Sequence, residues 1–156
     1  MTSTAFQDNY PDELSHCYGC GKHNDHGLQL KSRWDGDETV AEYNPRPEHT
    51  AIPGFVYGGL LASIIDCHGT GSASAAAYKA EGREMGSEPA LRFVTGNLNV
   101  DFLKPTPMGV TIIARGTIRE QTHKKVIVDI VLSSNGVAVA KGHVIAVKMP
   151  DSMLSA

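Results

Sequence analysis

The sequence lacks any run of the roughly 18 consecutive apolar residues that a membrane-spanning helix needs. Its polar, mildly acidic segment 1–15 also lacks the basic start and apolar core of a signal peptide. Both absences favour a soluble cytoplasmic protein with no membrane partner. Of the 156 residues, 41% are hydrophobic and 20% are charged, which suits one globular domain with a sizeable core.

The chain also has a small net charge and few cysteines. The formal charge is −3 at pH 7, so we expect no broad basic face and no nucleic-acid partner. Three cysteines are an odd number, which argues against a disulfide framework and fits reduced thiols in the cytosol.

Strand-like segments flank a single long helical segment. Residues 28–34 and 38–44 are predicted strands joined by an Asp-Gly turn. The proline-rich segment 45–56 is irregular, and residues 57–80 predict a helix with apolar residues on several faces. Four further strands are predicted over residues 91–103, 110–121, 125–134 and 137–149.

This order of elements favours one arrangement. Strands joined by tight turns, such as the one at Asn135-Gly136, must be antiparallel, and a helix that is apolar on several faces must be enclosed. We therefore expect an α+β protein whose antiparallel sheet wraps around one helix, aided by the small side chains of residues 72–77. Residues 1–15 would form an N-terminal arm, and residues 16–150 would form the domain. Its exposed sheet edges invite pairing with a second subunit.

Three motifs resemble a known enzyme family. They are CYGCGKHNDHGLQL (17–30), GFVYGGLLASIIDCHGTGSA (54–73) and TGNLNVDFLKPTP (95–107). They resemble the hotdog-fold acyl-CoA thioesterases of the phenylacetyl-CoA and 4-hydroxybenzoyl-CoA type, and the order of elements agrees over residues 16–149. The resemblance implies hydrolysis of an acyl-CoA to an acid and CoA, no cofactor, and a homodimer or homotetramer.

The resemblance also implies catalytic roles for three residues. In that family a glycine at the helix start donates its backbone N–H to the thioester carbonyl, and Gly58 holds that position. Asp66 matches the carboxylate that acts as base or nucleophile, and Thr95 matches the hydroxyl residue that positions the carboxylate or the water. The resemblance further implies that Asp66 and Thr95 come from opposite subunits. Tyr57 stands where the family usually has histidine, and its hydroxyl can donate a hydrogen bond but cannot copy a histidine's titration.

The residues themselves leave two interpretations of this helix open. A period of 3.6 residues puts Gly59, Ser63, Asp66 and Thr70 on one face. A carboxylate within an apolar helix is unfavourable unless it is paired or used, so Asp66 is either a substrate-facing base or a buried structural residue. Free N–H groups at a helix start stabilise a developing oxyanion, although Gly-Gly pairs are also common in turns.

Substrate contacts are predicted near the helix start. We expect Phe55, Tyr57, Gly59 and Thr70 to contact the substrate, with the loop 45–56 lining the acyl pocket. The cations that could hold the CoA phosphates are Lys104, Arg119, His123, Lys124 and Lys125.

The segment around Cys17 and Cys20 suggests a zinc site at first sight, because three histidines lie within it. A second, well-separated ligand pair is missing, so we predict no metal site and favour a glycine-rich loop with buried thiols. Cys67 points about 100° around the helix from Asp66 and is interpreted as a core residue.

Two other functions stay compatible with the sequence. A hotdog enoyl-CoA hydratase or dehydratase pairs a histidine with an acid near the helix start, and Tyr57 at that position weakens this alternative. His49 and His68 are the auxiliary candidates, although a lone histidine is more often structural. A non-catalytic acyl-CoA-binding module is the second alternative.

Overall fold

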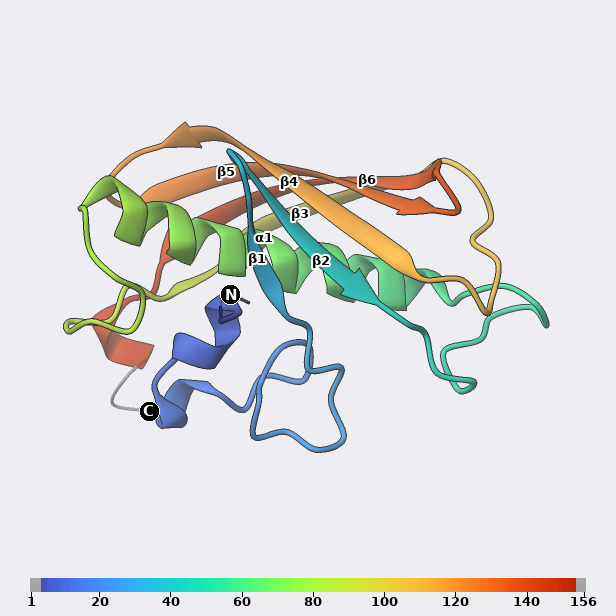
Figure 1. The fold of residues 1–156 in the computed structure, drawn as a ribbon, viewed down its shortest axis with the longest axis horizontal. Coiled ribbons are helices and arrows are strands. Elements are labelled where there is room, and N and C mark those ends of the chain that lie inside the picture. Colours follow the sequence, from blue (N-terminus) through green and yellow to red (C-terminus); the bar gives the residue numbers. More distant parts are fainter. Residues whose placement is uncertain (1–3, 154–156) are drawn as a thin grey trace.

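One curved antiparallel sheet wraps around one long helix in the computed structural model, which describes residues 4–153 (Figure 1). The strand order is β1-β2-β4-β5-β6-β3, and each neighbouring pair is antiparallel. The α+β hotdog fold predicted from the sequence is therefore confirmed. The elements are η1 (Phe6–Asn9), η2 (Asp12–Leu14), β1 (Ser32–Asp35), β2 (Glu38–Tyr43), α1 (Gly58–Ala80), β3 (Phe93–Phe102), β4 (Ile112–Gln121), β5 (Lys125–Ser134), β6 (Val137–Lys148) and η3 (Asp151–Met153).

Helix α1 is enclosed on two sides. The concave face of the sheet covers one side, and the N-terminal segment that holds η1 and η2 lies beneath the other (Figure 1). Residues 72–77 of the helix are all buried, as their small side chains predicted. Because the helix is covered on both sides, it does not require one continuous polar face. This explains why apolar residues occur on several of its faces.

Glycines let the helix and the sheet interlock closely. A Cβ at Gly142 of β6 would collide with Ile65 of α1, and a Cβ at Gly69 would lie 2.7 Å from Val144. Each glycine therefore receives a branched side chain from the opposite element. The close approach removes apolar surface from water along the middle of the helix, next to Asp66 in sequence.

The later strands agree closely with the prediction, whereas the first strand is shorter. Asn135 and Gly136 both have positive φ, as the predicted hairpin turn requires. The first strand was expected at residues 28–34, but Gln29 has a φ of 52°, which breaks the extended backbone. The N–H groups of Leu28 and Leu30 donate instead to Tyr18 and Gly19 in the cysteine loop.

The segment expected as an N-terminal arm packs against the domain. Phe6 and Tyr10 are buried, and Gln7 makes two hydrogen bonds to Ser32 at the start of β1. This segment contacts the short edge strand β1 at Ser32 and Trp34. No helix within residues 4–153 is both long and apolar enough to span a membrane.

Strand β3 forms the opposite edge of the sheet. It pairs with β6 along one side, and seven of its ten residues are exposed in the chain, including Leu98 and Phe102. A long exposed strand edge offers unpaired backbone groups to another chain. The two edges of the sheet therefore differ, because the short strand β1 is partly held by the N-terminal segment and the long strand β3 is open.

Candidate active site

Asp66 and Thr95 lie together on the exposed side of the fold. Asp66 directly follows the apolar segment Leu60–Ile65 of α1 and is partly exposed. Thr95 lies near the start of β3. The hydroxyl of Thr95 donates a hydrogen bond to Oδ1 of Asp66. The carboxylate is therefore oriented by one hydroxyl and stays open to solvent in the single chain.

This contact changes one prediction. The resemblance implied that Asp66 and Thr95 come from opposite subunits, but the structure joins them within one chain. The separated pair is instead Gly58 and Asp66, which are eight residues apart on one helix and hence about 12 Å apart along its axis. One chain therefore does not bring its own N–H donor and its own carboxylate to one carbonyl group.

The start of α1 carries the free N–H groups that the sequence predicted. Tyr57 is the N-cap residue, and its side chain makes no capping hydrogen bond. The first N–H groups of a helix lack partners within the helix, and they carry the positive end of its dipole. A Cβ at Gly59 would collide with the ring of Tyr57, so this ring lies across the helix start. Tyr57 is 58% exposed, so its ring is accessible to a ligand at the helix start.

A mainly apolar cavity of about 290 Å³ opens beside Gly58. Phe102 at the end of β3 lies within 3.4 Å of the position of a Cβ on Gly58, and Lys104 lies at the same cavity. Thr106 also lines it, and in the described part of the chain its buried hydroxyl has no hydrogen-bond partner. Sequence reasoning did not single out Phe102 or Thr106 as site residues, although both lie in the motif that ends the strand.

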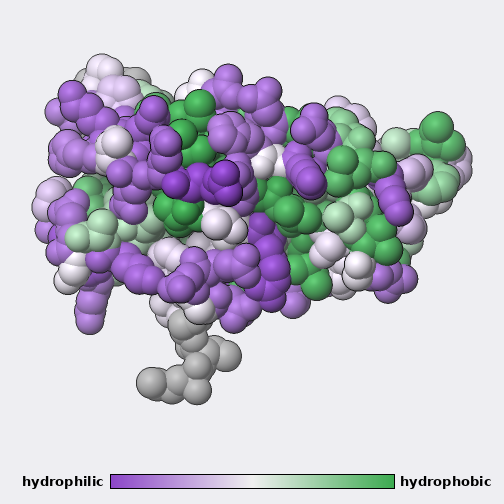
Figure 2. All heavy atoms as spheres, turned by 90° about the horizontal axis from the view of Figure 1, so that it is seen from above, coloured by the Kyte–Doolittle hydropathy of each residue, from purple (hydrophilic) through white to green (hydrophobic). Residues whose placement is uncertain are grey.

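Hydrophobic side chains gather at this end of the molecule, where the loop before α1 lies (Figures 1 and 2). Phe55 is exposed there, as is Ile52 of the same loop. The predicted contact residue Thr70 differs, because it is buried and its hydroxyl donates to backbone carbonyls within α1. The structure thus brings Phe55, Tyr57 and Gly59 to the helix start, and it leaves Thr70 apart from them.

The histidine nearest to Asp66 in sequence is structural. His68 is fully buried, and its two ring nitrogens bond to Ser32 at 2.8 Å and Thr39 at 3.0 Å. Thr39 in turn bonds to Ser72, 2.7 Å away. Burial lowers the pKa of His68 to about 4. His49, the other auxiliary candidate, is also buried, and its Nδ1 accepts the backbone N–H of Arg46.

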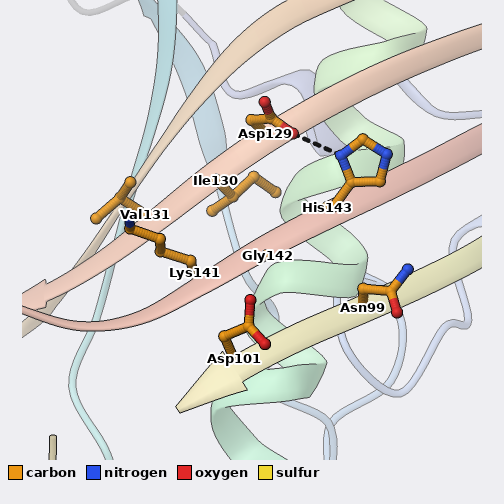
Figure 3. A pocket seen from close by; sticks show the side chains of 8 residues that line it. All are labelled: Asn99, Asp101, Asp129, Ile130, Val131, Lys141, Gly142 and His143. Carbon is orange, nitrogen blue, oxygen red and sulfur yellow. Dashed lines mark hydrogen bonds and ion pairs between the residues drawn. The ribbon is translucent and has the colours of Figure 1, made fainter. Parts of the chain in front are cut away.

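A second groove, of about 360 Å³, lies on the sheet face away from α1 (Figure 3). His143 Nδ1 and Asp129 make a hydrogen bond of 2.7 Å there, and Arg119 forms an ion pair with the same carboxylate at 3.1 Å. These side chains are partly exposed, and ion pairs of this kind contribute little to stability. The groove shares no residue with the Asp66 site, and its lining residues include no serine, threonine or cysteine.

Three cysteines from distant parts of the sequence lie close together where the loop 16–27 contacts α1. The sulfur atoms of Cys17, Cys20 and Cys67 all lie within 4.8 Å of one another. Hydrogen bonds from the thiols of Cys20 and Cys67 hold the pKa of Cys17 well below its usual range. The sequence missed this cluster, because no local pattern shows that Cys67 faces the loop of Cys17 and Cys20.

Comparison with known proteins gives the family. The family model described as thioesterase superfamily matches residues 53–140. A thioesterase superfamily protein from Shewanella loihica is 50% identical, and the alignment covers 90% of this chain and 100% of that one with a TM-score of 0.69. A comparison with curated proteins finds no match.

More distant structures share the fold. The E. coli PaaI protein from the phenylacetic acid degradation operon is 18% identical, with 79% and 81% of the two chains covered and a TM-score of 0.63. A thioesterase from Haemophilus influenzae is 15% identical, with 90% and 91% covered and a TM-score of 0.67. With its family-model match, a half-identical relative and the hotdog arrangement of sheet and helix, the chain belongs to the thioesterase superfamily.

Proposed function

We propose that this protein hydrolyses acyl-CoA thioesters, with Asp66 as the catalytic carboxylate. The single observation that carries the proposal is the hydrogen bond from Thr95 to Asp66, because it orients a solvent-accessible carboxylate on a mostly apolar helix. A structural aspartate would be expected inside the core with several donors. Asp66 has the exposure of a group that meets a substrate.

The chemistry follows from the two ends of the site. The backbone N–H of Gly58, at the positive end of the helix dipole, stabilises the negative charge that develops on the thioester oxygen. Asp66 takes a proton from a water molecule that attacks the acyl carbon, or it attacks this carbon directly to form an anhydride that water then hydrolyses. Thr95 positions the carboxylate. CoA leaves as its thiolate and the acid is released, so the reaction needs no cofactor.

The reaction centre in this proposal is formed by two chains. Because Gly58 and Asp66 of one chain are about 12 Å apart along the helix, each must act with its counterpart from a second copy. The open edge at β3 provides a surface for that copy, since two such strands can pair antiparallel and extend the sheet. A homodimer is the smallest assembly that completes the site, and a tetramer of two dimers is compatible with it.

The substrate would enter along the apolar end of the molecule. The cavity beside Gly58 offers apolar surface for the acyl chain, and Lys104 at the same cavity offers a charge for the CoA phosphates. The buried hydroxyl of Thr106 is available as a hydrogen-bond donor to a ligand there. The cytoplasmic location stays a prediction from the sequence, and the protein would encounter acyl-CoA in that compartment.

The first test is a hydrolysis screen across aromatic, short and long acyl-CoAs, in which the released thiol is measured. We expect turnover of at least one class by the wild type and a kcat/KM about a thousandfold lower for Asp66→Asn. Hydration of a short enoyl-CoA, measured in parallel, would favour the hydratase instead. Tight acyl-CoA binding by calorimetry with no thiol release would contradict catalysis and favour a binding module.

The second test mixes two inactive variants. Gly58→Pro removes the backbone N–H at the first helical position, where proline is tolerated, and the extended Tyr57 can precede a proline. Dimers reassembled from equal amounts of Gly58→Pro and Asp66→Asn chains would contain one intact site in every mixed dimer. We expect about a quarter of the wild-type activity to return. If Gly58 and Asp66 act within one chain, no activity returns.

A further inference from the structure

The cysteine cluster lies outside the proposed reaction centre and joins two distant segments. Cys17 and Cys20 belong to the tight loop before β1, and Cys67 belongs to α1, fifty residues further along the chain. Cys20 and Cys67 are buried, and Cys17 is the most exposed of the three. The catalytic proposal uses none of these sulfur atoms.

We propose that Cys17, Cys20 and Cys67 bind a divalent thiophilic metal ion, with Zn²⁺ as the ion to test, and that this ion clasps the loop 16–27 to α1. Each thiol loses its proton on binding and becomes a thiolate ligand. Solvent supplies the fourth ligand on the side of Cys17, where the cluster is open.

The distances between the sulfur atoms suit this ion. Tetrahedral zinc with Zn–S bonds of about 2.3 Å holds its sulfur ligands about 3.8 Å apart. The sulfur atoms of Cys17 and Cys67 are 3.7 Å apart, and all three lie within 4.8 Å of one another. Small shifts of the side chains would complete the triangle of ligands.

The loop is shaped around the thiols. The backbone N–H groups of Gly19 and Cys20 approach Cys17 and stabilise its sulfur as an anion. A Cβ at Gly19 would collide with the sulfur of Cys67, and one at Gly21 would collide with the backbone at Cys17. Both glycines are therefore required for the loop to bring two thiols against the third.

A half-buried cation matches the charge of the metal-bound cluster. Arg92 interacts electrostatically with all three cysteines, stacks on Tyr10 and has no carboxylate partner among residues 4–153. Three thiolates with one divalent ion carry a net charge of −1, which the guanidinium neutralises. A monovalent ion would leave −2 at the same place, so the charge balance favours a divalent ion.

The nearby histidines serve other contacts. His23 lies 2.9 Å from a carboxylate oxygen of Asp12, and the ring of His16 contacts the ring of His23 at a tilt of 44°. Neither belongs to the group of potential ligands around the sulfur atoms among the described residues. The third ligand is thus Cys67, and the site differs from a purely local Cys-x-x-Cys and histidine site.

The test measures metal in the purified full-length protein under reducing conditions. We expect about one Zn²⁺ per chain by mass spectrometry, and Co²⁺ in its place should give thiolate-to-metal charge-transfer absorption typical of tetrahedral sites. Cys17→Ser and Cys67→Ser should lose both signals. His23→Ala is the matched control, and it should keep them. Since Cys67→Ser could fail to fold, the exposed Cys17→Ser variant carries the same test.

The outcomes separate this inference from the catalytic proposal. Asp66→Asn should retain the full metal content, and added Zn²⁺ should raise the melting temperature of the wild type but not of Cys17→Ser. The inference is overturned by a fully reduced wild type that binds neither Zn²⁺ nor Co²⁺. It is equally overturned if Cys67→Ser binds as the wild type does, or if intact mass shows a disulfide among these cysteines and no metal.

Discussion

Two polar residues only two positions apart on α1 occupy opposite kinds of surroundings. Asp66 faces the open side of the fold, where Thr95 donates one hydrogen bond to it. His68 faces the interior, where Ser32 and Thr39 engage both of its ring nitrogens. Asp66 keeps its carboxylate accessible, whereas both ring nitrogens of His68 have hydrogen-bond partners.

The difference teaches how one helix serves two purposes. A buried polar network is stabilising only when each of its members has partners, and the His68 network meets that condition. A catalytic group must instead keep bonding capacity for the substrate. We therefore expect changes at Asp66 to affect turnover and changes at His68 to affect folding.

The largest expected effect is at Asp66. Asp66→Asn keeps the size of the side chain and removes its charge, so kcat/KM for acyl-CoA should fall by about a thousandfold. The free energy of unfolding should change by less than about 0.5 kcal/mol, because the side chain is partly exposed. Asp37→Asn, at an exposed position in the turn between β1 and β2, is the control and should keep its activity. Unchanged kinetics in Asp66→Asn would remove this residue from the mechanism.

The next largest effect should be on stability. His68→Leu leaves Ser32 and Thr39 without their shared partner in the core, which should lower the free energy of unfolding by about 3 kcal/mol. Denaturant titration measures the loss, and kcat below the melting transition should stay near the wild-type value. A large fall in kcat of the folded variant would show instead that His68 takes part in catalysis.

The pH dependence of stability offers a milder test of the same contrast. Burial lowers the pKa of His68 from 6.5 to about 4, so the unfolded chain binds a proton between these values and the folded chain does not. The stabilisation is present above pH 6.5 and is lost as pH falls. The loss should amount to about 2 kcal/mol at pH 5. Denaturant titrations above pH 6.5 and at pH 5 should show this loss in the wild type. His68→Leu should lack the contribution of His68 to the loss.

The smallest effect concerns the positioning of the carboxylate. Thr95→Val removes the hydroxyl that bonds to Asp66 but keeps the shape of the side chain, so kcat should fall about tenfold while KM changes little. Thr95→Ser retains the hydroxyl and should restore most of the rate. If Thr95→Ser is as slow as Thr95→Val, the role of Thr95 lies in packing rather than in the hydrogen bond.

The fold was largely predictable, because its signals are local. The Asn135-Gly136 turn, the alternating strands and the small residues 72–77 each specify their own conformation. The first strand was predicted too long, because nothing in its sequence shows that Gln29 takes a positive φ. Its backbone follows the cysteine loop, and a contact of that kind does not appear in a pattern along the chain.

The candidate site was predictable in part. Asp66, Gly58 and Thr95 were selected from motif positions, and the structure joins Asp66 with Thr95 in one chain. The cavity at Phe102 and Thr106 was missed, since it forms only when the end of β3 packs against the start of α1. Family resemblance identified the residues, whereas packing decided which of them meet.

By itself, the sequence determined the antiparallel sheet, the enclosed helix and the carboxylate on that helix, because each depends on spacing along the chain. The tertiary structure alone decided which side each polar residue faces. It placed His68 in the core and brought Cys67 next to Cys17 and Cys20. It also packed the N-terminal segment against β1 and left β3 open. These outcomes depend on contacts between distant segments, and neither composition nor periodicity encodes such contacts.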